Sequence, residues 1–127
     1  MSRESIIAEA LANERVAEQC AIDLIPVIRE MFKKRLKKVA PELPEIIVQV
    51  SEDLPEGKVG TYKVPNEKHS EGILTVSPGA FNGDKAPYWY VIAHELIHAF
   101  LGPKSESHEG DFYILADELG IPDKYRD

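Results

Sequence analysis

The chain has 127 residues, of which 43% are hydrophobic and 29% charged. This length suits one domain, and the balance is typical of a soluble globular protein rather than a disordered or membrane protein. No apolar run reaches the ~20 residues that a membrane-crossing helix needs, and charges interrupt the N-terminal stretch, unlike a secretory signal. Cys20 is the single cysteine, which excludes an intramolecular disulfide, and its apolar neighbours indicate a core residue rather than a nucleophile. We therefore expect one cytoplasmic domain over residues 1–127, with no membrane attachment.

The net charge of −7 disfavours a general affinity for nucleic acid. The charge is uneven, because residues 29–38 hold six basic side chains and one acidic one. This net charge of +5 leaves −12 on the rest of the chain. A basic helical face of this kind can meet nucleic-acid phosphates, but a solvated helix face is the commoner explanation and the one we favour.

Helical periodicity predicts two N-terminal helices, over about residues 5–19 and 23–39. Asp23 is a suitable N-cap for the second helix, and Pro26 would then lie in its first turn, where a missing N–H costs little. A single continuous helix would instead be kinked at Pro26. The side chains expected to face the core are Ile7, Leu11, Ala17, Ile25, Ile28, Phe32, Leu36 and Val39.

Three short runs with strand character come next, and two further helices follow them. The strand runs are residues 46–50, 59–64 and 72–76. A polar loop joins the second run to the third, which predicts a hairpin. The helices are expected from about Pro87 to Leu101, ended by Gly102, and from Glu109 to Leu119, ended by Gly120. The predicted fold class is α+β, with N-terminal helices, a small and mostly antiparallel three-stranded sheet, and these two helices.

The segment that carries chemistry is an HExxH motif, His94-Glu95-Leu96-Ile97-His98, within the helix that starts near Pro87. On a helix, His94 and His98 lie one turn apart on one face, a spacing that lets both bind one tetrahedral metal ion. Glu95 lies about 100° round from His94 and about 60° from His98, so it flanks the metal ion without binding it. A carboxylate there can take a proton from an attacking water and deliver it to a leaving amine.

The surroundings of the motif favour a metal ion over a chance occurrence. From Tyr88 to Leu101 the only strongly polar side chains are His94, Glu95 and His98, and a helix apolar nearly all round is a buried helix. Burying these three groups costs free energy unless each has a strong partner. A divalent cation supplies that partner, and the ligand types predict one Zn²⁺ per chain.

A third protein ligand is needed, and His108 is the first choice, because the chain can turn back over the site at Gly102-Pro103. The competing candidates are Glu106, Glu109, Asp117 and Glu118. His69 lies in a polar loop and is interpreted as a surface histidine. The oxyanion of the transition state would be stabilised by the metal ion alone or by a phenol such as Tyr62 or Tyr113, between which the sequence does not choose.

The run VIAHELIHAFLG, then His108, then Phe112 four residues on, then LADELGI, resembles the SprT-like family of zinc metallopeptidases. The resemblance covers about residues 87–121 in detail and departs from the family at Glu109, where relatives often have glycine. It implies a zincin-like fold and peptide-bond hydrolysis as the reaction. It also implies that zinc is held by His94, His98 and His108, and that Glu95 is the catalytic acid and base.

The resulting prediction is a zinc metallopeptidase that uses a metal-activated water, with Glu95 as general base. Its substrate would be an extended protein or peptide laid along the edge of the sheet. The alternative is a non-catalytic, zinc-stabilised binding module that uses the basic helix 29–38, with a protein side chain in the fourth coordination position. A metal-dependent nuclease or deaminase is disfavoured, since the deaminase type needs two cysteines. Glu95 favours the enzyme, because a structural zinc site has no use for a general base.

Overall fold

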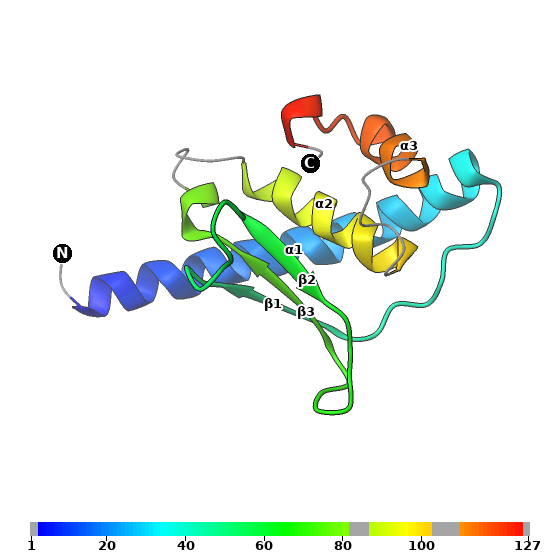
Figure 1. The fold of residues 1–127 in the computed structure, drawn as a ribbon. Coiled ribbons are helices and arrows are strands. Elements are labelled where there is room, and N and C mark those ends of the chain that lie inside the picture. Colours follow the sequence, from blue (N-terminus) through cyan, green and yellow to red (C-terminus); the bar gives the residue numbers. More distant parts are fainter. Residues whose placement is uncertain (1–2, 82–86, 103–109, 126–127) are drawn as a thin grey trace.

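The computed structural model describes residues 3–81, 87–102 and 110–125 (Figure 1). The elements are α1 (Arg3–Leu36), β1 (Ile46–Val50), β2 (Gly60–Lys63), β3 (Gly72–Val76), the 3₁₀ turn η1 (Pro78–Phe81), α2 (Tyr88–Leu101), α3 (Asp111–Glu118) and the 3₁₀ turn η3 (Asp123–Tyr125). The α+β prediction is confirmed, and so are the three strands and the two C-terminal helices.

Helix α1 is one continuous helix of 34 residues, so the prediction of two helices with a cap at Asp23 is wrong. Pro26 lies inside the helix on its exposed side. A proline in a helix interior costs about 3 kcal/mol. A buried stripe continues on both sides of it, formed by Ala17, Ala21, Ile28 and Phe32. Packing along this stripe offsets the cost of the proline, which is why the helix does not end there.

Two side chains predicted for the core are exposed instead. Leu11 is 54% exposed, and the N-terminal part of α1 extends beyond the sheet (Figure 1). Val39 is 86% exposed, because α1 ends at Leu36 and Lys37 takes a left-handed conformation with φ 58°, so that Val39 leaves the helical stripe. The side chain of Ile7 lies outside the described part of the structure. None of the described helices combines the length and the apolar character that crossing a membrane requires.

The sheet has the strand order β1-β3-β2. Strand β3 pairs with β2 in antiparallel fashion, which confirms the predicted hairpin, and with β1 in parallel. The sheet is therefore mixed, and the prediction of a mostly antiparallel sheet is wrong. Strand runs in a sequence indicate where strands form, whereas the partner of β1 depends on packing between distant segments.

Both long helices cover the same face of the sheet. Helix α1 packs on β1, α2 packs on β2 and β3, and the two helices contact each other. Register and burial agree, because Val48, Leu74 and Val76 share one face and are buried, whereas Ile47 and Gln49 on the other face are exposed. The core thus lies between the sheet and the two helices, and it includes the helix that carries the HExxH motif.

Gly60, the first residue of β2, is a point of close approach between the sheet and α2. A Cβ atom on Gly60 would lie 2.3 Å from Cγ1 of Val91, closer than such atoms are found. We expect Gly60→Ala to lower the free energy of unfolding by about 1–3 kcal/mol, as overpacking of a core does. Chemical denaturation measures this change. The double variant Gly60→Ala, Val91→Ala removes the clashing methyl group and should be less destabilised than the two single effects added together; strict additivity would contradict the clash.

Candidate metal centre

Helix α2 carries the motif and is bounded as its sequence predicts. It begins directly after Pro87, whose carbonyl accepts from the N–H groups of Tyr90 and Val91. It ends at Gly102, where φ is 83° and the N–H donates to the His98 carbonyl at 2.9 Å. The buried positions are Val91, Ile92, Ala93, His94, Glu95, Leu96, Ile97 and Phe100. The prediction of a buried helix is therefore confirmed.

His94 and His98 point their Nε2 atoms toward each other, 3.2 Å apart. Two nitrogens bound to one tetrahedral zinc ion at 2.0–2.1 Å lie about 3.3–3.4 Å apart, so the observed separation fits a shared metal ion. A hydrogen bond between two neutral imidazoles, with one Nε2–H donating, gives a similar distance. The pair is thus in place to bind a metal ion through both Nε2 atoms, and the presence of metal distinguishes the two arrangements.

Glu95 is buried beside the histidine pair, with 9% of its surface exposed. Its Oε2 lies 3.9 Å from Nε2 of His94, beyond hydrogen-bond distance but close enough to share a small ligand with it. Burial raises the pKa of Glu95 from the usual 4.5 to about 7, and the charge of Lys58 opposes part of this rise. A carboxyl group with a pKa near neutrality can both accept and return a proton, as a general base must.

Phe112 of α3 contacts both imidazoles. The centroid of its ring lies 5.0 Å from that of His94 and 4.7 Å from that of His98, and the side chain is buried. The ring therefore shields one side of the histidine pair from water and limits how far the imidazoles can turn. In the sequence, Phe112 is identified only through the family resemblance. Its place on the apolar face of a short helix is the signal that predicts its burial.

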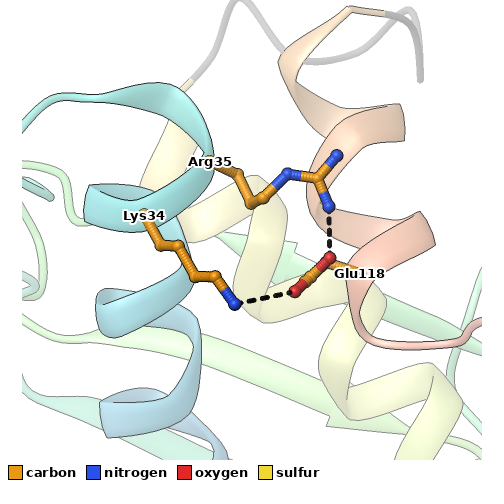
Figure 2. Close-up of polar contacts among 3 residues, drawn as sticks. All are labelled: Lys34, Arg35 and Glu118. Carbon is orange, nitrogen blue, oxygen red and sulfur yellow. Dashed lines mark hydrogen bonds and ion pairs between the residues drawn. The ribbon is translucent and has the colours of Figure 1, made fainter.

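Among the residues that the structure describes, no group of three His, Cys, Asp or Glu side chains is arranged to hold a metal ion. The predicted third ligand, His108, lies outside the described residues, as do Glu106 and Glu109. Of the other two candidates, Asp117 is exposed on α3, and Glu118 pairs with Arg35 of α1 (Figure 2). Neither of these two carboxylates joins His94 and His98.

The two phenols named as oxyanion candidates lie in different surroundings. Tyr113 is exposed, and its hydroxyl donates to Oδ1 of Asp123 at 3.0 Å. The Tyr62 ring lies across Gly72, so close that a Cβ on Gly72 would fall 2.1 Å from the hydroxyl. Tyr62 shares its strand face with Gly60, the face that α2 covers. Of the two, Tyr62 is therefore on the side of the sheet where the candidate centre lies.

The remaining histidine and the cysteine take no part in the centre. His69 lies in the loop between β2 and β3, is half-buried, and shares a 2.7 Å hydrogen bond through Nδ1 with the Glu71 carbonyl. Burial, and to a lesser extent Asp23, raises the pKa of Cys20 to about 11. This thiol stays protonated near neutral pH, in agreement with the prediction that Cys20 is no nucleophile.

Comparisons of the chain with models of protein families, with curated proteins and with solved structures find no match. The case for a function therefore depends on the motif and on the geometry around it.

Proposed function

We propose that this chain is a zinc-dependent metallopeptidase of the SprT-like kind with a zincin-like core. His94, His98 and His108 would hold the metal ion, and Glu95 would act as the general base. The observation that carries the proposal is the 3.2 Å separation of the two Nε2 atoms beside a buried carboxyl group with a raised pKa. A histidine pair that only filled the core would not need a titratable carboxyl group buried next to it.

The unpaired edge of the sheet, within the described part of the chain, is an argument for a peptide as the substrate. Strand β2 is at one end of the strand order, so within the described part of the chain one of its edges has no partner strand. The first residue of β2, Gly60, packs against α2, and a Cβ at that position would contact Cγ of Glu95 at 3.5 Å. An extended peptide that pairs with β2 as a further strand would therefore pass the carboxyl group of Glu95.

The chemistry follows from these groups. Bound zinc would supply a Lewis acid that polarises the peptide carbonyl and lowers the pKa of water. His94 and His98 must present unprotonated Nε2 atoms, so metal binding weakens as these imidazoles become protonated at low pH. Glu95 takes a proton from the attacking water and gives it to the leaving nitrogen when the carbon–nitrogen bond breaks. Phe112 keeps bulk water away from one side of the imidazoles.

The alternative, a zinc-stabilised binding module that uses the basic segment 29–38, is less well supported. In that segment Lys34, Arg35 and Lys38 pair with acidic side chains of α3, which reduces the charge available to a nucleic acid. The buried carboxyl group of Glu95 also has no purpose in such a module.

Metal content tests the proposal directly. Plasma mass spectrometry of the wild type, purified without chelators, should find about one zinc ion per chain. His98→Ala should lose nearly all of it, because a histidine ligand binds the metal directly. His108→Ala tests the third ligand in the same way. His69→Ala, a histidine outside the centre, is the matched control and should keep its zinc. A metal-free wild type, or an H98A protein with full zinc, would rule the proposal out.

A further inference from the structure

The basic end of α1 lies against one face of α3. The carboxylate of Glu118 pairs with Arg35 and also with Nζ of Lys34 at 3.9 Å (Figure 2). At the other end of α3, Oδ2 of Asp111 pairs with Nζ of Lys38 at 3.2 Å. These five side chains are called the clasp below. The clasp joins segments that are more than 70 positions apart in the chain.

The clasp holds the short helix α3 at both of its ends. Asp111 and Glu118 are seven residues apart, which places them about 20° apart around the helix and therefore on one face. Phe112 and Leu115 lie on the neighbouring face and are buried. The partly exposed ion pairs at both ends of this face add a modest preference for this placement of α3, which sliding or rotation of the helix would reduce. The position of the Phe112 ring is thereby linked to the ion pairs of the clasp.

The stability of α3 as a helix does not explain why Glu118 is acidic. With eight residues, α3 is too short to be stable in isolation, so its place depends on its contacts with the rest of the chain. Glu118 lies in the last turn, where the helix dipole disfavours a negative charge. Asp111, in the first turn, is favoured by the dipole. Glu118 is thus an unfavourable choice for the helix alone, and its pairing with Arg35 and Lys34 compensates for it.

Two basic side chains of the same segment, Arg29 and the clasp residue Lys38, also lie near aromatic rings of the core. The guanidinium of Arg29 lies 5.8 Å from the ring centroid of Phe100, and Nζ of Lys38 lies 5.7 Å from that of Phe32. Cations over aromatic rings add modest attraction at such distances. Four of the six basic side chains in residues 29–38 are therefore engaged within the chain, which favours an internal role for this segment over a role in binding nucleic acid.

We propose that Arg35 and Glu118 are positioning residues for the metal centre. The clasp places α3 so that Phe112 rests against His94 and His98, and this contact keeps both Nε2 atoms at the separation that a shared metal ion requires. Loss of the clasp leaves the ligands in the chain but lets their rings turn, which weakens metal binding. The inference rests on the proposed function in taking His94 and His98 as metal ligands.

Charge reversal with rescue tests the clasp. The variants are Arg35→Glu, Glu118→Arg and the double swap, and the readout is the zinc Kd, measured by competition with a chromophoric chelator. Each single variant should bind zinc about three- to tenfold more weakly, the scale of a lost ion pair plus added repulsion. The double swap restores the pair of residues 35 and 118 in reverse but brings a positive charge opposite Lys34, so it should recover most, but not all, of the lost affinity. The matched control is Lys33→Glu, an exposed residue of the same basic turn with no ion pair within the described residues, which should change Kd by less than about twofold.

Far-UV circular dichroism and denaturation of the zinc-free proteins accompany each Kd. If Glu118→Arg does not fold, Glu118→Gln removes the charge without reversal and should weaken binding about two- to threefold. Single variants that are folded and bind zinc as tightly as the wild type would overturn the proposal that the clasp positions the metal centre, even if their stability falls. A double swap no better than the single variants would also overturn it. A wild type that binds no zinc would overturn the proposed function and the clasp together, so the two failures are distinct.

Discussion

If the chain is the proposed metallopeptidase, replacing Glu95 by glutamine is expected to slow peptide hydrolysis steeply while zinc stays bound at about one ion per chain. Glutamine has nearly the same shape, so it fits the buried site, but it cannot accept a proton from water. A positioned general base contributes about 10²–10⁴-fold to a rate, so kcat/KM should fall by about that factor. Cleavage of a quenched-fluorescent peptide library, together with metal analysis of the same samples, measures both quantities.

The matched control for this substitution is Glu52→Gln, which changes an exposed carboxylate in the segment after β1. It should cleave the library at the wild-type rate. Full hydrolysis by the Glu95→Gln protein would show that Glu95 is not the base. Loss of zinc from that protein would instead mean that the carboxylate helps to hold the metal ion, contrary to the geometry expected for a residue that flanks it.

The same carboxyl group should make the zinc-free protein less stable as the pH rises. Burial holds the folded-state pKa of Glu95 at about 7, whereas its usual value is 4.5. Between these two values the folded protein binds more protons than the unfolded chain does, so the free energy of unfolding falls with increasing pH. The loss from this group begins near pH 4.5, is complete above about pH 7, and amounts to about 3 kcal/mol.

Chemical denaturation at several pH values measures this effect, with a chelator present and with Glu95→Gln as the reference. The difference in unfolding free energy between the two proteins should be small near pH 4.5. It should grow in favour of the glutamine variant to about 3 kcal/mol above pH 7. Added zinc should reduce the difference, because a nearby cation favours the charged carboxylate and lowers its pKa. Parallel pH profiles of the two zinc-free proteins would show that burial does not perturb Glu95.

The HExxH helix could be predicted closely because all of its signals are local. Pro87 and Gly102 mark its ends, and the four-residue spacing of His94 and His98 puts both rings on one face by helix geometry alone. An almost uninterrupted apolar sequence predicts its burial, which the structure confirms. The β2–β3 hairpin was predicted for the same reason, since a short polar loop between two strand runs leaves few other arrangements.

Helix α1 and strand β1 show where local signals are insufficient. Pro26 is a sound local reason to end a helix, and it is overridden because a stripe of buried side chains continues past it. Strand β1 was located correctly, but its parallel pairing with β3 depends on how α1 and the segment that follows it pack against the sheet. Both errors have one cause: packing between distant segments outweighed a local preference.

In the candidate centre, too, some features could be predicted from the sequence and others depend on the tertiary structure. The identities of His94, Glu95 and His98, the common face of the two histidines and the flanking position of Glu95 follow from the sequence, since they depend on one helix. The raised pKa of Glu95, the contact of Phe112 with both imidazoles and the pairing of Glu118 with Arg35 do not follow from it. Each depends on which surfaces of separate elements meet when the core closes, and neither periodicity nor composition specifies that choice.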